Sequence, residues 1–177
     1  MKLAEQVVDS SYSAVINAPI EKINLPEWAF NLSEKDYQEC SPAHVTAAVT
    51  TGPDGRRMSI NVEVLGGSPM VQHYQEEVSK PDHLVLTSFS DVYTPAGRIV
   101  MHVRWELIVK KISDTQTEFT NHVTSHATED MVNNLEKQGI PFSLFKAQRQ
   151  PVSTYHNQTE TPRFAASIER AALLAGR

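Results

Sequence analysis

Two residues of this chain, Glu76 and Tyr74, have the types and spacing needed to move protons. Residues two positions apart on a β-strand face the same side, and we expect apolar side chains of neighbouring strands beside them. A carboxyl group buried in such surroundings has a raised pKa and can act as a general acid or base. We therefore take both as candidate catalytic residues. A solvated carboxylate near the strand end is the alternative, and a one-residue shift in register would replace Glu76 with His73 and Glu77.

Three histidines, His102, His122 and His126, invite a metal interpretation that their spacing does not support. Four residues of extended strand span about 13 Å, so His122 and His126 cannot both bind one ion. Alternation also places all three on the polar face that we expect to meet solvent. The sequence therefore predicts no metal and no other cofactor. The Gly-x-Ser-x-Gly turn of a Ser/His/Asp hydrolase is absent, and the paired glycines mark turns, not a phosphate-binding loop.

An apolar wall with a few polar groups is predicted where two long alternating segments meet at the turn over residues 94–97. If Tyr93 faces Arg98, Leu86 faces Trp105 on the same side of the sheet. Such a wall is typical of small-molecule sites. The predicted ligand-binding residues are Tyr74, Leu86, Ser88, Ser90, Met101, Val103, Trp105 and Asn121. A packed core with hydrogen-bonded polar residues is the alternative.

A broad antiparallel sheet must carry these side chains, because alternation with a period of two marks one buried face. The expected strands cover residues 12–17, 44–51, 57–65, 68–78, 84–93, 98–112 and 117–127. We expect Val78 to lie opposite Leu84. Short helices are predicted before residue 42, and further helices over 129–138, over 142–150 ended by Pro151, and from Thr161-Pro162 onward. This order predicts an α+β fold with the helices on one side of the sheet.

Length and composition favour one domain over residues 1–177 and restrict its partners. The net charge is −5 and no run of basic residues occurs, which argues against nucleic acid. No segment approaches the roughly 20 apolar residues that span a bilayer, so no membrane insertion is expected. The single cysteine, Cys40, excludes an internal disulfide and fits a reducing compartment. We expect a cytoplasmic protein.

Three segments resemble the START-related, SRPBCC or birch-pollen-allergen-like superfamily, which includes polyketide-cyclase-like proteins. The segments are the opening strand with Ala18-Pro19-Ile20-Glu21, the turn from Tyr74 to Thr87, and the hairpin from Trp105 to Phe119. The resemblance implies a helix-grip fold, in which a curved seven-stranded antiparallel sheet surrounds a C-terminal helix. The C-terminal part of this chain has more residues than one such helix needs, so extra helical segments are expected.

The resemblance implies a small, largely hydrophobic ligand, aromatic or polyketide-like, held in an internal cavity. Two alternatives remain open: an enzyme of the cyclase/aromatase or dehydratase type that uses the same cavity, and an interaction module like the chaperone-ATPase activators. Lys146 and Arg149 are candidates to meet an anionic ligand group. The apolar cluster of Phe142, Leu144 and Phe145 suggests either a lid or a contact in a homodimer.

Overall fold

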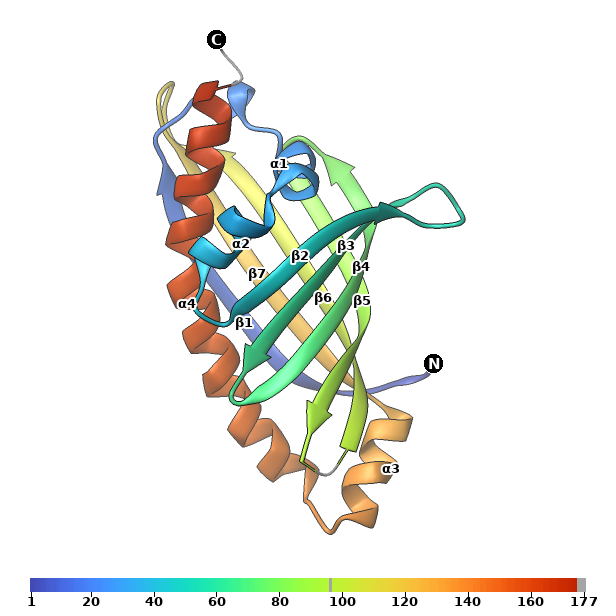
Figure 1. The fold of residues 1–177 in the computed structure, drawn as a ribbon. Helices are drawn as coiled ribbons and strands as arrows, with labels where there is room; N and C mark the ends of the chain where they lie inside the picture. The colour runs from blue at the N-terminus through green and yellow to red at the C-terminus, as the bar shows by residue number, and fades with distance from the viewer. Residues whose placement is uncertain (96, 175–177) are drawn as a thin grey trace.

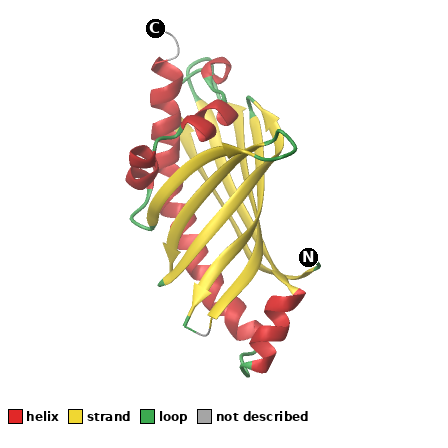
Figure 2. Ribbon diagram, turned by 45° about the vertical axis from the view of Figure 1, so that its right-hand side comes forward, coloured by secondary structure: helices red, strands yellow, loops and turns green. Residues whose placement is uncertain are grey.

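A seven-stranded antiparallel sheet forms the body of the protein in a computed structural model that describes residues 1–95 and 97–174; Ala96 of the predicted turn lies outside them. The spatial order is β1-β7-β6-β5-β4-β3-β2. The strands are β1 (Leu3–Ile16), β2 (His44–Thr51), β3 (Arg57–Leu65), β4 (Ser68–Lys80), β5 (His83–Thr94), β6 (Gly97–Lys111) and β7 (Thr117–Thr128). The helices are a 3-10 turn η1 (Ile20–Lys22), α1 (Leu25–Asn31), α2 (Glu34–Cys40), α3 (Glu129–Lys137) and α4 (Phe142–Leu174). The sheet curves around α4, and α3 lies at the opposite end from α1 and α2 (Figures 1 and 2).

The β5–β6 hairpin has the predicted register, because its alternation is unbroken. Tyr93 pairs with Arg98, and Leu86 pairs with Trp105. Buried and partly exposed residues alternate along β6 from Ile99 to Val109. The predicted bounds of β2 and β3 also hold, since a turn with Gly55 at a φ of 83° joins them.

Two predictions about the strands were wrong. Val78 pairs with Val85 rather than Leu84, because the pairing of β4 with β5 continues to Lys80 and His83 and so leaves a tighter turn than expected. A register shift between Glu76 and Val78 then offsets this difference, so that Glu76 pairs with Leu86. The first strand begins at Leu3 rather than near residue 12. Register shifts near the start of β1 bury both Val7 and Val8, although these residues are adjacent. The sequence there therefore lacks the alternation of buried and exposed residues that marks a strand.

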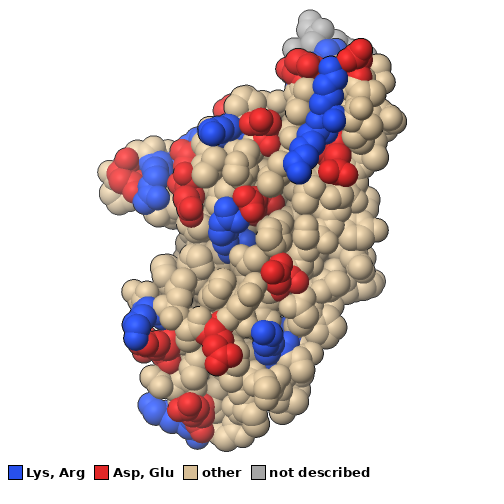
Figure 3. All heavy atoms as spheres, turned by 180° about the vertical axis from the view of Figure 1, so that it is seen from behind, with Lys and Arg blue, Asp and Glu red and all other residues tan. Residues whose placement is uncertain are grey.

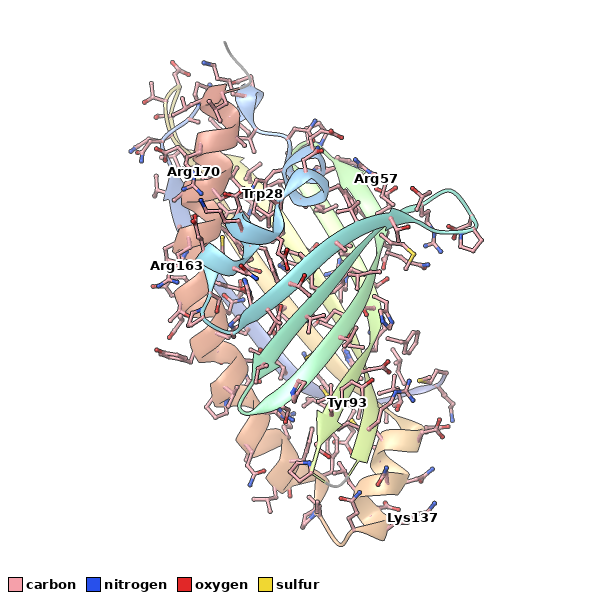
Figure 4. The ribbon with its side chains drawn as sticks, in the orientation of Figure 1. Trp28, Arg57, Tyr93, Lys137, Arg163 and Arg170 are labelled. Carbon is pink, nitrogen blue, oxygen red and sulfur yellow. The ribbon has the colours of Figure 1, made fainter. Side chains whose placement is uncertain are left out.

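Helices α1 and α2 close one end of the curved sheet, and both begin at side-chain caps. Asn24 accepts a hydrogen bond from the amide of Glu27, and Ser33 accepts one from that of Asp36. Trp28 of α1 packs edge-on against Phe164 of α4, with ring centroids 5.3 Å apart. Figure 4 labels Trp28 at this junction, so α1 is anchored on the helix that the sheet encloses.

One continuous helix of 33 residues, α4, replaces the two C-terminal helices that the sequence predicts. Pro151 and Pro162 lie inside it, although an interior proline costs about 3 kcal/mol or more. Burial of one face against the sheet, mainly on β1, outweighs this cost. Phe164 and Ile168 of this face are buried, whereas Leu173 near the end of the helix is exposed.

Charges of both signs are interspersed over the face shown in Figure 3, where acidic groups flank the most extended stretch of Lys and Arg surface. Within the described residues, no helix combines the length and apolar character that crossing a bilayer would require.

Candidate functional site

A cavity of about 70 Å³ lies between the concave face of the sheet and α4. Its apolar and aromatic walls come from Val8, Leu65, Met70, Val92, Met101, Val103, Trp105, Val123, Val152 and Phe164. Its polar lining consists of Tyr37, Asn61, Glu63, Gln72, Tyr74, Ser125, Arg149, Ser153, His156, Asn157 and Glu160. The polar groups are numerous for a hydrophobic core, and several of them are ionisable.

One stripe of α4 forms the helical wall of this cavity. The lining residues of α4 are Arg149, Val152, Ser153, His156, Asn157, Glu160 and Phe164. Their spacing of three and four residues keeps them on one face of an α-helix. Arg149 and His156 are seven residues apart, which corresponds to about 10.5 Å along the axis. The helix therefore presents a cation toward one part of the cavity and a histidine–carboxylate pair toward another.

Four ionisable side chains meet beside the cavity, and we name His44, Glu63, His156 and Glu160 the His–Glu cluster. Glu160 Oε2 lies 3.2 Å from His44 Nε2 and 3.1 Å from His156 Nε2. Glu63 lies slightly further away, with Oε1 3.9 Å from His44 Nε2 and Oε2 3.7 Å from His156 Nε2. The side chain of His44 is fully buried, and that of His156 is 12% exposed.

A second layer of hydrogen bonds holds the His–Glu cluster in place. His44 Nδ1 lies 2.7 Å from the carbonyl oxygen of Tyr37, whose ring stacks on the imidazole with centroids 3.9 Å apart. The Tyr37 hydroxyl donates to Glu63 Oε1 at 2.7 Å. Asn121 donates to Glu160 Oε1 at 3.0 Å and accepts from the indole N–H of Trp105 at 2.9 Å. These partners fix the orientation of one imidazole and both carboxylates.

The electrostatics of the cluster favour charged side chains despite burial. Burial lowers the pKa of His156, but Glu160 and Glu63 outweigh it and raise this pKa to about 9. Burial raises the pKa of Glu160, yet His156 and His44 hold it well below its ordinary value. Burial and the nearby carboxylate of Glu63 raise the pKa of Tyr74 well above its ordinary range. The cavity is therefore lined by a buried ion pair, His156 with Glu160, and by the neutral phenol of Tyr74.

Two buried polar atoms of the cavity lining, Gln72 Oε1 and Ser125 Oγ, have no hydrogen-bond partner among the described residues. Arg149 hydrogen-bonds to the carbonyl oxygen of Leu65 at 3.1 Å and to Ser68 Oγ at 2.9 Å. Within the described part of the chain it forms no ion pair, and burial lowers its pKa. These groups have hydrogen-bonding capacity left for a bound molecule.

Half of the predicted ligand-binding residues line the cavity, and half lie behind its wall. Those in the lining are Tyr74, Met101, Val103 and Trp105. Those outside the lining are Leu86, Ser88, Ser90 and Asn121, all of them buried. Ser88 Oγ accepts a hydrogen bond from the backbone amide of His73, and the Ser90 hydroxyl donates to Ser88 Oγ, so both hydroxyls serve the sheet. Asn121 acts indirectly, through its bonds to Trp105 and Glu160.

The two candidate catalytic residues are separated by the structure. Tyr74 is buried in the cavity wall, whereas Glu76 lies outside the lining and binds the backbone amide and guanidinium of Arg57 at 3.1 and 3.2 Å. Burial tends to raise the pKa of Glu76, but the hydrogen bonds from Arg57 lower it. The expected rise in this pKa was therefore wrong, because the sequence gives no sign that Arg57 of the neighbouring strand reaches it.

The histidines considered in the sequence lie away from the His–Glu cluster. His122 Nε2 is 2.8 Å from Asp9, and the rings of His102 and His126 are 6.5 Å apart. The residues that come together are instead His44, at the start of β2, and His156, in α4. A usable signal was present, since His156 and Glu160 have the four-residue spacing of neighbours on a helix. The predicted helix boundaries at Pro151 and Thr161 concealed it.

Comparison with solved structures places this architecture among known folds. The Zhui aromatase/cyclase from Streptomyces sp. R1128 aligns at a TM-score of 0.61 and 10% identity, covering 96% of this chain and 95% of that one. A START superfamily protein from Mycobacterium smegmatis aligns at 0.55 and 11% identity, covering 97% and 99%. A norcoclaurine synthase from Thalictrum flavum aligns at 0.53 and 12% identity, covering 98% and 99%.

This chain has the helix-grip fold of the START-related superfamily. The predicted resemblance is thereby confirmed at the level of the fold. No protein-family model and no curated protein matches the sequence. At identities near 10%, the structural neighbours establish only the fold, and the chemistry must be argued from the residues of this chain.

Proposed function

We propose that this protein binds a small, largely hydrophobic metabolite in the cavity between the sheet and α4. The observation that carries the proposal is the pair of unpartnered atoms, Gln72 Oε1 and Ser125 Oγ, in a mostly apolar lining. A buried polar atom without a partner costs about 1–3 kcal/mol. A ligand that offers a donor to Gln72 and a polar atom to Ser125 would remove this cost.

The lining also defines the chemistry of the ligand. Trp105 lies 5.5 Å from Tyr74 and 5.8 Å from Phe164 between ring centroids, so aromatic surfaces surround one region of the cavity. Flat, ring-containing molecules gain most from such surroundings. Arg149, without an acidic partner among the described residues, suits an anionic or carbonyl oxygen at the other end. An aromatic or polyketide-like molecule with one polar end meets both requirements.

The size of the cavity requires that binding enlarge it. Pockets for drug-sized ligands have volumes of about 300–1,000 Å³, whereas this cavity has about 70 Å³. Met70 and Met101 line it and have flexible side chains that can repack. We therefore expect binding to move α4 or these methionines, and to proceed more slowly than simple diffusion.

A second candidate function is acid–base catalysis of the cyclase/aromatase or dehydratase type. The observation that favours it is that His156, Glu160 and Tyr74 line the cavity that would hold the substrate. The Tyr74 hydroxyl makes no hydrogen bond to a described residue, and its raised pKa keeps it a proton donor. Two of the structural neighbours are named for enzymes, an aromatase/cyclase and a synthase.

Ligand binding can be tested with 1-anilinonaphthalene-8-sulfonate, an aromatic anion whose fluorescence rises in apolar sites. We expect saturable binding that Ser125→Leu weakens at least about tenfold, or 1.4 kcal/mol, because leucine fills the cavity. Thr124→Leu is the matched control, since Thr124 lies next to Ser125 on β7 but outside the lining. Native mass spectrometry of the freshly purified protein should also show an organic molecule bound.

If Ser125→Leu and Thr124→Leu bind the fluorescent probe equally well, the cavity is not the binding site, and the interaction-module alternative is favoured. To separate a carrier from an enzyme, Tyr74→Phe keeps the aromatic surface and removes the hydroxyl. A carrier should bind the co-purified molecule equally well after this change, whereas an acid–base enzyme should lose turnover of it.

A further inference from the structure

The His–Glu cluster has a charge pattern that calls for cations at its centre. The carbonyl oxygen of Tyr37 can only accept, so His44 Nδ1, 2.7 Å away, carries a proton. A neutral His44 would then present the lone pair of Nε2 toward the oxygens of two carboxylates. That arrangement is repulsive unless positive charge lies between these atoms. Either two protons, one on each imidazole, or one divalent cation would supply it.

The donor atoms are spaced as ligands of one metal ion. Ligand atoms about 2.1 Å from a tetrahedral ion are separated by about 3.4 Å. Glu160 Oε2 lies 3.1 Å from His156 Nε2 and 3.2 Å from His44 Nε2. Glu63 Oε2 lies 3.7 Å from His156 Nε2, whereas the 3.9 Å separation from His44 Nε2 belongs to the other Glu63 oxygen, Oε1. One atom each from His44, Glu63 and His156 fall within 4.8 Å of one another. Two imidazoles and carboxylate oxygens form a donor set that suits zinc, iron and neighbouring metals.

The surroundings match those that orient metal ligands. A histidine ligand commonly donates its second ring N–H to a carbonyl or carboxylate oxygen, and ligand carboxylates are themselves hydrogen-bonded. His44 has such a bond to the backbone of Tyr37, and Glu63 accepts from the Tyr37 hydroxyl. Glu160 Oε1 accepts from Asn121, which leaves Oε2 facing both imidazoles. Glu63 Oε2 makes no hydrogen bond to any described residue, so it is free to bind an ion.

We propose that the His–Glu cluster binds one divalent first-row transition-metal ion through Nε2 of His44 and His156 and one carboxylate oxygen from each of Glu63 and Glu160. The inference goes beyond the proposed function, because hydrophobic binding does not need a metal. Three of the four residues line the cavity, whereas His44 lies behind them. A bound ion would therefore face the cavity, where an oxygen of a ligand could complete its coordination.

Metal binding is tested on the full chain after treatment with a chelator. Titration with Co²⁺, followed by its visible absorption, and with Zn²⁺, followed by calorimetry, should each show one equivalent bound. The near-isosteric variants Glu63→Gln and Glu160→Gln should each weaken binding by roughly 100-fold or more. His126→Gln is the matched control, because His126 lies outside the cluster, and it should bind as the wild type does.

Three results would overturn the proposal: no Co²⁺ or Zn²⁺ binding by the folded protein, equal binding by the glutamine variants, or loss of binding in His126→Gln. The first would leave two protons as the shared cations and would agree with the metal-free protein that the sequence predicts. Circular dichroism and anilinonaphthalene sulfonate binding verify that each variant is folded. Because probe binding is measured without metal, failure of the metal site and failure of the cavity are separate outcomes.

Discussion

Replacement of Asn121 by alanine provides the sharpest test of how the site is supported. Asn121 is fully buried and joins the indole N–H of Trp105, the Oε1 of Glu160 and the hydroxyl of Thr161 at 2.9, 3.0 and 3.2 Å. Alanine leaves the indole N–H without a partner, at about 1–3 kcal/mol, and removes a bond to a charged carboxylate, worth about 1.5–3 kcal/mol. We expect Asn121→Ala to lower the free energy of unfolding by about 3–5 kcal/mol.

Urea denaturation followed by far-ultraviolet circular dichroism measures this difference directly. Asn133→Ala is the matched control, since Asn133 is exposed on α3, and its effect should stay within about 0.5 kcal/mol. A loss below about 1 kcal/mol in Asn121→Ala, with an unchanged dependence on urea, would refute the view that Asn121 connects the sheet to Glu160.

Three further predictions concern other parts of the molecule. The hydrogen bonds from Arg104 and His83 lower the pKa of Glu106 to about 2, so its stabilisation is present above the unfolded value of 4.5 and is lost as the pH falls through about 2. Glu106→Gln should therefore reduce stability at pH 7 by about 1–3 kcal/mol, and the difference from wild type in urea titrations should vanish near pH 2. Burial raises the pKa of the Cys40 thiol to about 12, so a thiol reagent at pH 8 should label it only after unfolding. Pro151→Ala should raise the melting temperature by a few degrees, because Pro151 is exposed inside α4 and alanine restores a helical hydrogen bond; a lower melting temperature would contradict this.

The sheet was predictable because its signals are local. Alternation over β5 and β6 fixes which side chains face inward, and a turn rich in glycine joins β2 to β3. Cross-strand partners such as Leu86 and Trp105 follow from counting outward from one turn. The same counting failed for Val78 of β4, because the pairing continues to Lys80 and His83 and the turn is tighter than the sequence indicates.

The His–Glu cluster was not predictable in the same way, because its members are far apart in sequence. His44 lies opposite Glu63 across β2 and β3 only because a register shift between His44 and Thr46 interrupts the regular pairing of the predicted hairpin. Glu160 reaches them only because α4 lies across the concave face, which is a property of the whole fold. The prolines at positions 151 and 162 predict that the helix ends there, because proline has a very low helix propensity. The sequence therefore argues locally against the continuous helix that brings Glu160 to the cluster.

Several features of this protein that are unfavourable for stability lie around the cavity, and all of them depend on the continuity of α4. Were the helix to end at Pro151, Arg149 and His156 would not share a face, and the cavity would lose its polar wall. The helix instead runs through both prolines, at about 3 kcal/mol each, and holds buried ionisable groups that apolar residues of similar volume could replace without loss of stability. Local conflicts of this kind concentrate at functional sites, because selection for stability alone would remove them. The helix with its two interior prolines, the buried charges and the unpartnered polar atoms of the lining all border the same cavity. That coincidence favours a role in binding or catalysis over a merely structural core.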